Sequence, residues 1–170
     1  MATAVKHDWI YTGLASAIPN IEPDSAKVRT KITLPGSSDG PDLPPCKIYR
    51  PPSPDSDATS CTELSLSESQ TSIGLEPQVM VFRYRNKLHA IDHICPHRHY
   101  PLSRGSLTDI EDFGIVLSTA ITCPGHGWAF DVNTGQCSRG GGYRLGIWDV
   151  EVRRTEDGEE GVWVRMKAGR

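Results

Sequence analysis

Cys95-Pro96-His97 and Cys123-Pro124-Gly125-His126 each place one thiol and one imidazole a residue or two apart. Zinc fingers usually group their ligands differently, with two cysteines in one place and two histidines in another. The mixed order C-x-H … C-x2-H is typical of a [2Fe–2S] centre in which two histidines replace two cysteines on one of the irons. We therefore predict an iron–sulfur cluster with four protein ligands: Cys95, His97, Cys123 and His126. A structural zinc site with the same ligands is the alternative.

The residues that follow each pair narrow this prediction to one family. The first pair leads into His97-Arg98-His99-Tyr100-Pro101-Leu102-Ser103-Arg104-Gly105, and the second into His126-Gly127-Trp128-Ala129-Phe130-Asp131-Val132-Asn133-Thr134-Gly135. Both strings resemble the two cluster-binding loops of Rieske ferredoxins and of the Rieske domains in ring-hydroxylating oxygenases. The resemblance implies one Rieske-type [2Fe–2S] cluster. It also implies an inner iron held by Cys95 and Cys123. The outer, more exposed iron would take His97 and His126.

Within this family the chain resembles the low-potential branch. High-potential members carry an additional cysteine in each loop, and the two are joined by a disulfide; here Tyr100 and Gly125 stand in those places. High-potential members also have a serine and a tyrosine that donate hydrogen bonds to sulfur, whereas Trp128 and Phe130 carry no hydroxyl. With fewer donors to stabilise the reduced cluster, we expect a potential near the low end of the Rieske range, about −150 mV.

The spacing between the two loops departs from the family pattern. Residues 98–122 form a longer gap than the family usually shows. The additional length falls in Thr108-Asp109-Ile110-Glu111-Asp112-Phe113-Gly114, where acidic residues and a glycine indicate an enlarged turn before a strand that begins at Ile115.

Composition indicates a small globular protein. The chain has 170 residues, of which 37% are hydrophobic and 23% charged, and its net charge is −3. We expect a single domain over residues 1–170, and a monomer. The charge gives no reason to expect binding to nucleic acid or to an anionic membrane surface, and no apolar run is long enough to span a bilayer. The first residues lack a signal peptide or an Arg-rich presequence, so we expect a cytoplasmic protein.

Three cysteines remain after the ligands are assigned. Cys46, Cys61 and Cys137 form an odd remainder in a chain without a secretory signal, which favours free thiols over a disulfide framework. Cys137 follows the second loop closely, but a role as a small buried hydrophobe is the simpler reading.

Alternating apolar and polar residues predict an all-β fold. Several short strands separated by turn signals are typical of an antiparallel sandwich or barrel. The expected strands are Trp9–Leu14, Val28–Leu34, Lys47–Arg50, Val79–Tyr84, Leu88–Ile91, Ile115–Thr122, Gly127–Val132, Leu145–Val152 and Val162–Val164. The Rieske resemblance likewise implies an all-β fold, with a small cluster-binding subdomain at about residues 90–142 inserted into a larger sheet.

Residues 51–72 differ from the rest in composition. Seven serines, three threonines and three prolines crowd these positions, and no Lys or Arg occurs between Arg50 and Arg83. Such a polar stretch buries too little apolar surface to order itself, so we predict a flexible loop at about 51–75.

Several residues near the loops have two possible roles. Arg98, Arg104, Arg139 and Arg144 form either a basic rim that steers an acidic redox partner or scattered solvated side chains. Tyr100 and Trp128 either cover the cluster or pack in the core. Gly140-Gly141-Gly142 forms either a third covering loop or a plain turn. We expect His89 and His93 to be structural or exposed, and His99 to be a solvated loop residue rather than part of a proton relay or of a docking surface.

The prediction is therefore a one-electron carrier that takes electrons from a flavin-type reductase and passes them to an oxygenase or another acceptor. A chain with its own oxygenase chemistry needs a mononuclear iron site, normally two histidines and a carboxylate. Only 44 residues follow His126 and none is histidine, so we lean away from an enzyme. The alternatives are a Rieske subunit of a larger oxidoreductase, such as an oxygenase or a nitrite-reductase-like assembly, and a redox-sensing iron–sulfur protein.

Overall fold

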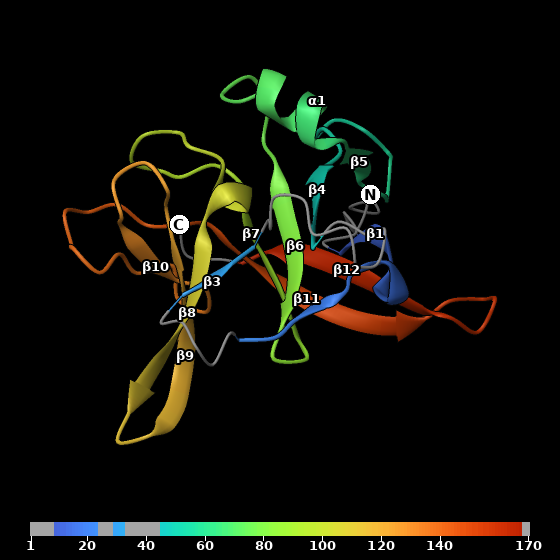
Figure 1. Ribbon diagram of the computed structural model, residues 1–170. Coiled ribbons are helices and arrows are strands. Elements are labelled where there is room, and N and C mark those ends of the chain that lie inside the picture. Colours follow the sequence, from blue (N-terminus) through green and yellow to red (C-terminus); the bar gives the residue numbers. More distant parts are fainter. Residues whose placement is uncertain (1–8, 24–28, 33–44, 168–170) are drawn as a thin grey trace, which may run out of the picture.

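The computed structural model describes residues 9–23, 29–32 and 45–167, which fold into two β-sheets (Figure 1). The larger sheet has the order β1 (Ile10–Leu14), β12 (Glu160–Met166), β11 (Ile147–Arg154), β7 (Lys87–Asp92), β6 (Val79–Tyr84), β4 (Cys46–Arg50) and β5 (Thr62–Leu64). Strand β2 (Asn20–Ile21) adds to this sheet as a parallel partner of β6. The smaller sheet has the order β10 (Ala129–Asp131), β9 (Ile115–Thr122), β8 (Ser106–Asp112) and β3 (Thr30–Lys31).

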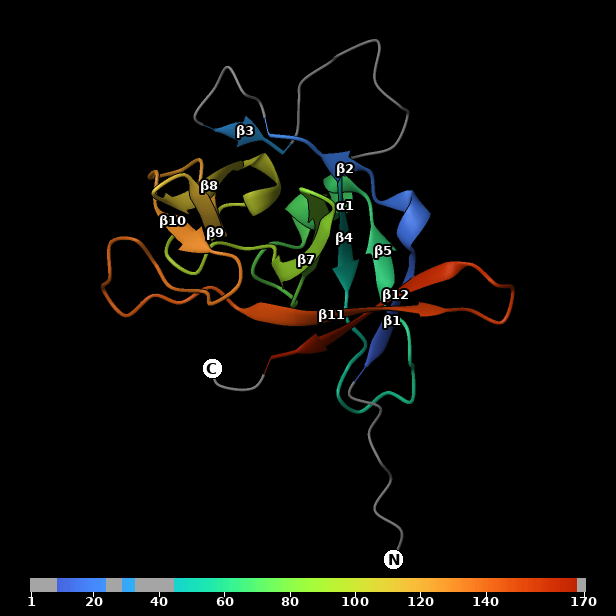
Figure 2. The ribbon, with the colours of Figure 1, turned by 90° about the horizontal axis from the view of Figure 1, so that it is seen from below.

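The two sheets share one hydrophobic core. Phe82 and Ile91 of the larger sheet and Leu107, Ile121 and Phe130 of the smaller sheet are fully buried in the same cluster. Figure 2 shows the smaller sheet lying to one side of β7, and β11 and β12 passing below β7. Apart from the β2–β6 pair, the paired strands run antiparallel, so the prediction of an all-β antiparallel fold is confirmed.

Local turn chemistry sets the register of the hairpin that leads to the first loop. Strands β6 and β7 pair from Val79↔Asp92 to Tyr84↔Lys87, which leaves Arg85 and Asn86 as a two-residue turn. Both residues have positive φ, 49° and 61°, as a type I′ turn requires. Both strands lie where the sequence predicted them, with β7 one residue longer at each end than the expected Leu88–Ile91.

Two expectations about loops are wrong. Residues 51–72 do not form one structureless loop, because they contain β5 and the helix α1 (Leu66–Thr71). The segment 108–114 is not an enlarged turn either. Strand β8 continues to Asp112, and only Phe113 and Gly114 connect it to β9.

Other elements follow the predicted ranges with small shifts. Two 3-10 helices, Ala15–Ala17 and Leu102–Arg104, complete the fold. In the predicted range Val28–Leu34 only β3 is assigned as strand, and positions 28, 33 and 34 lie outside the described residues. None of the helices in the described part of the chain has the length and hydropathy to cross a membrane.

Candidate metal centre

Two loops of matching geometry carry the predicted ligands. In the first, the backbone N–H of Cys95 donates to the carbonyl of Tyr100 at 2.9 Å, and the N–H of His99 donates to the carbonyl of Cys95 at 2.9 Å. In the second, Cys123 donates to the carbonyl of Trp128 at 2.8 Å, and Gly127 donates to the carbonyl of Cys123 at 3.1 Å. The same two bonds therefore close both loops, each counted from its cysteine.

The residues at the base of the two loops also pair in the same way. Ile94 pairs with Pro101 across the first loop, and Thr122 pairs with Ala129 across the second. The fifth position of each loop is left-handed, with φ of 59° at His99 and 68° at Gly127. His99 thus matches Gly127 in backbone conformation, and histidine adopts this conformation more often than most residues with a side chain.

The loops sort the four predicted ligands by exposure. Cys95 is fully buried and Cys123 is 2% exposed, whereas His97 is half-buried and His126 is exposed. The two imidazole rings lie 5.4 Å apart, centroid to centroid, so both can reach one metal ion. The two thiols are thus more deeply buried than the two imidazoles.

Electrostatics around the donors also suit metal binding. Burial is the main cause that raises the pKa of Cys123, and the neighbouring Cys95 thiol raises it further. The backbone N–H groups of Gly125 and His126 act in the opposite direction, because they donate toward the Cys123 sulfur and favour the thiolate. Partial burial, the charge of Arg98 and the nearby His126 lower the pKa of His97. His97 is therefore neutral near pH 7, the form that binds metal.

The grouping of the donors suits a two-iron cluster. The two thiols, Cys95 and Cys123, are both buried, and the two imidazoles, His97 and His126, lie close together nearer the surface. Each iron of a [2Fe–2S] cluster of this type takes two protein ligands. The residues present therefore fit that cluster.

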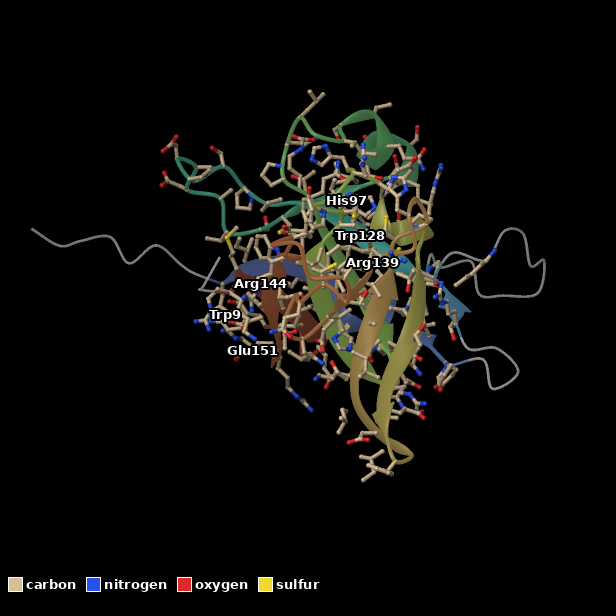
Figure 3. All side chains as sticks on the ribbon, turned by 90° about the vertical axis from the view of Figure 1, so that its left-hand side faces the viewer. Trp9, His97, Trp128, Arg139, Arg144 and Glu151 are labelled. Atoms are coloured by element: carbon tan, nitrogen blue, oxygen red, sulfur yellow. The ribbon has the colours of Figure 1, made fainter. Side chains whose placement is uncertain are left out.

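Aromatic side chains cover the histidine end of the site. The ring of Trp128 stacks on His97 with a centroid distance of 3.8 Å and an interplanar angle of 9°. Tyr143 packs edge-on against both rings, at 5.1 Å from His97 and 5.4 Å from Trp128. Trp128 therefore acts as a cover for His97 (Figure 3). Tyr143, which the sequence did not single out, completes that cover.

The glycine run before Tyr143 explains how the backbone brings Tyr143 over His97. Gly140, Gly141 and Gly142 have φ of 68°, 76° and 77°, a left-handed run that residues with a side chain rarely adopt. It carries the chain from Cys137, next to the second loop, to Tyr143 over His97. The third covering loop was one of the two roles that the sequence left open, and the ring contacts of Tyr143 favour it.

A chain of buried hydrogen bonds holds both ends of the first loop. The His93 ring bonds to Gln78 Oε1 through Nδ1 at 2.7 Å and to Ser103 Oγ through Nε2 at 2.8 Å. Gln78 in turn donates to the Ser69 carbonyl in α1 at 2.9 Å. His93 is thus structural, as expected. Gln78 and Ser103 escaped sequence analysis because their partners lie 15 and 10 residues from them in the chain.

The loops that carry the donors are basic. Arg98, Arg104, Arg139 and Arg144 are all exposed, and residues 93–108, 113–130 and 132–148 contain no Asp or Glu. Figure 3 shows Arg139 and Arg144 on the same side of the molecule as His97 and Trp128. The three cysteines outside the ligand set, Cys46, Cys61 and Cys137, are free thiols, as predicted.

Comparison with known proteins agrees with this geometry. The family model of the Rieske [2Fe-2S] domain matches residues 58–142, half of the chain. The ferredoxin component of the alkene monooxygenase system of Xanthobacter autotrophicus is 38% identical over 61 residues, which cover 36% of this chain and 43% of that protein. The match thus spans less than half the length of this curated relative.

Solved structures of similar proteins include three with electron-transfer or reductase names. The ferredoxin of carbazole 1,9a-dioxygenase from Nocardioides aromaticivorans IC177 is 29% identical, with a TM-score of 0.39 over 54% of this chain and 77% of that one. A Sphingomonas yanoikuyae B1 ferredoxin is 25% identical, with a TM-score of 0.36 over 56% and 79%. A chain assigned as the NADH-dependent nitrite reductase small subunit of Mycobacterium tuberculosis is 21% identical, with a TM-score of 0.40 over 56% and 79%.

All three TM-scores lie below 0.5, so these likenesses say nothing specific about what this chain does. The family match is different, because it includes both loops and ends at the glycine run. The chain therefore belongs to the Rieske [2Fe-2S] domain family, whose cofactor is one Rieske-type [2Fe–2S] cluster.

Proposed function

We propose that this chain is a one-electron carrier that holds its cluster through four side chains. Cys95 and Cys123 bind one iron, and His97 and His126 bind the other. The observation that carries this proposal is the pair of matching loops, which buries both thiols and places both imidazoles nearer the surface. The bound cluster supplies one-electron redox chemistry.

The protein's own groups tune and insulate that site. The buried thiolates are kept from water, and the N–H groups of Gly125 and His126 partly neutralise the Cys123 sulfur. Trp128 lies against His97 and Phe130 is fully buried, and neither has a hydroxyl to donate to sulfur. This small number of donors supports a potential near the low end of the Rieske range, about −150 mV.

The histidine end is the face through which electrons enter and leave. It combines two imidazoles with four exposed arginines on loops that lack carboxylates. Such a face attracts partners with an acidic docking surface and raises the rate of encounter more than the affinity. A flavin-type reductase as donor and an oxygenase as acceptor fit this role, and the alkene monooxygenase relative is itself a ferredoxin component.

We propose a monomer with one domain over 1–170, in which residues from about 90 to 142 form the cluster-binding part. Both ligand loops and the strands β8, β9 and β10 of the smaller sheet fall in this range. The larger sheet then serves as the base on which these loops are mounted.

Spectroscopy of the purified protein tests the function. We expect a brown-red protein with two irons and two acid-labile sulfides per chain and an anisotropic EPR signal once reduced. NADPH or NADH with a ferredoxin reductase should reduce it, and voltammetry should find a midpoint below zero. A colourless protein that contains zinc would contradict the proposal, as would a cluster that no reductase reduces.

Ligand variants test the assignment. Cys95→Ser and Cys123→Ser should each lose the visible spectrum and the labile sulfide, because the cluster contributes to the folding of its loops. His99→Ala is the matched control, since His99 lies in the same loop but is exposed. The control should keep the full spectrum. Undiminished iron and sulfide in either cysteine variant would refute the assignment.

A further inference from the structure

The distal half of the β8–β9 hairpin projects from the molecule as a free arm (Figure 1). Strand β3 pairs with β8 only at Ser106 and Leu107, and β10 pairs with β9 only from Ala120 to Thr122. Beyond these points no other described strand pairs with residues 110–117 on either edge. Among the described strands, the arm is thus a two-stranded ribbon without a further partner on either edge.

The base of this arm is held firmly. Arg85, in the β6–β7 turn, binds Asp109 through a two-pronged ion pair with distances of 2.6 to 3.1 Å. On the other strand, Ser118 Oγ donates to Asp131 at 2.9 Å and accepts from Asn133 at 2.7 Å. Because these interactions fix the base of the arm, the tip is held in a defined direction.

The tip is apolar and exposed. Phe113 is 99% exposed, Ile115 65% and Leu117 63%. Phe113 contributes nothing to the core, and its φ of 48° is one that a two-residue hairpin turn normally assigns to Asn or Gly. Neither core packing nor turn formation accounts for a phenylalanine at this position. A large apolar side chain that is exposed to solvent, and that neither core packing nor turn formation explains, indicates a contact with another molecule.

Charge decides between the possible partners. Glu111 and Asp112 are exposed beside the apolar tip, and no Lys or Arg occurs between Arg104 and Arg139. Two arms of two copies packed against each other would bring these carboxylates together, and an anionic membrane would repel them. The basic histidine end of a second copy is not a choice either, because the electron-transfer partner needs that face. A protein cleft with apolar walls and a basic rim satisfies both the phenylalanine and the carboxylates.

The arm points away from the two ligand loops. Cys123 follows the last residue of β9, and the tip lies at the first residue of the same eight-residue strand. An extended strand of that length separates them by about 26 Å. A partner held at the tip therefore leaves the histidine end free to exchange electrons.

We propose that Glu111–Leu117 is a docking arm that inserts Phe113 and Ile115 into an apolar, basic-rimmed cleft of a partner protein. This interaction is separate from the electron-transfer face and does not depend on the identity of the redox cofactor. Its small size suits a transient complex, in which one buried aromatic anchor supplies much of the affinity.

The first experiment identifies the partner. A photo-crosslinking phenylalanine analogue replaces Phe113 in the full-length protein, and crosslinking is carried out in the cells that naturally make it. The captured protein is then purified, and its Kd for the wild-type holoprotein is measured. The proposal requires a defined complex with that purified protein. Crosslinks only to lipid, to a second copy, or to nothing overturn it.

The second experiment separates docking from stability. Phe113→Asn should weaken the complex about tenfold or more, because it removes a buried apolar anchor. The same variant should keep or raise Tm, since Asn tolerates positive φ. Leu75→Ser is the matched control, because Leu75 is 82% exposed but lies outside the arm. It should bind like the wild type. A lower Tm with unchanged Kd in Phe113→Asn overturns the proposal.

The third experiment tests the basic rim. The wild-type complex should weaken as salt is added, and the double variant Glu111→Gln/Asp112→Asn should lose part of that dependence. An equal salt dependence in both proteins would overturn the charge complementarity on which the choice of partner rests.

Discussion

Tyr100 and Gly125 form a contact between the two loops at the places where high-potential relatives carry a disulfide. A Cβ added to Gly125 would lie 2.5 Å from Cε2 of Tyr100, so the tyrosine ring rests directly on the glycine backbone. The ring also packs edge-on against His126, with centroids 6.2 Å apart. A van der Waals contact thus joins the two loops here in place of a covalent bond.

This contact predicts a specific coupling between the two positions. Gly125→Ala should destabilise the holoprotein by about 1–3 kcal/mol, because the added methyl overpacks the contact. Gly125 has no positive φ, so alanine brings no backbone strain of its own. In the double variant Tyr100→Ala/Gly125→Ala, the methyl gains space and part of the loss should be recovered. A double-mutant cycle on Tm measures this, and purely additive effects would contradict it.

At the scale of elements, α1 shows how a polar segment becomes ordered. Ser65 accepts from the backbone N–H of Glu68 at 3.1 Å, and the Glu68 carboxylate accepts from the backbone N–H of Ser65 at 2.7 Å. This capping box begins the helix, and the Gln78 bond to the Ser69 carbonyl ties the helix to β6. The hydrogen bonds to the Ser65 backbone and side chain lower the pKa of Glu68.

Removing the cap should have a measurable local effect. Ser65→Ala should cost about 1 kcal/mol and increase amide exchange in residues 66–72, because one donor at the helix start loses its partner. Ser67→Ala is the control, since Ser67 lies on the same helix but does not cap it. Equal exchange in the two variants would show that the cap does not hold this helix.

The β8–β9 hairpin shows that strand pairing can keep a segment with turn-forming residues extended. Glycine and acidic residues predicted a turn over 108–114, but cross-strand pairs from Ser106↔Thr122 to Asp112↔Ile115 keep most of this range extended. Turn residues therefore located the reversal near Gly114 correctly and misjudged its length. The strand pairing depends on β9, which lies outside the segment itself.

At the scale of the whole molecule, a buried histidine links stability to pH. His89 is 6% exposed on β7 and stacks on Phe82 at 5.3 Å. Burial first, and then the charge of Lys87, lower its pKa to about 4. In the unfolded chain the pKa is about 6.5, so between these values the unfolded state binds the proton. The contribution of the neutral His89 ring to the free energy of unfolding is complete above pH 6.5 and is lost as the pH falls toward 4.

A variant isolates this contribution. Between pH 7 and pH 5 the wild type should lose about 2 kcal/mol more stability than His89→Leu, or about 4–8 °C in Tm. His93 has a pKa lowered to about 4 by burial, but it is present in both proteins and cancels in the comparison. Thermal unfolding at the two pH values gives the difference. Parallel losses in wild type and variant would show that His89 does not titrate as the structure indicates.

The sequence alone indicated the family, its cofactor and much of the sheet. The cysteine–histidine spacings are local, so each loop could be read without knowledge of its neighbours, although the four ligands stay a prediction. The hairpin of β6 and β7 was equally accessible, because alternating residues and the Arg85–Asn86 turn lie within one short segment. The helix α1 had a local signal too, Ser65 and Glu68 three residues apart, which the polar composition around it concealed.

Only the tertiary structure decided what surrounds the site. Tyr143 on His97, Tyr100 on Gly125 and the Gln78–His93 bond all join residues that are at least 15 positions apart. Sequence patterns do not specify such contacts, because they depend on how the loops are mounted on the two sheets. The free arm is a property of the same kind. Whether an apolar residue is buried depends on which strands reach it, and around Phe113 the described strands leave it in water.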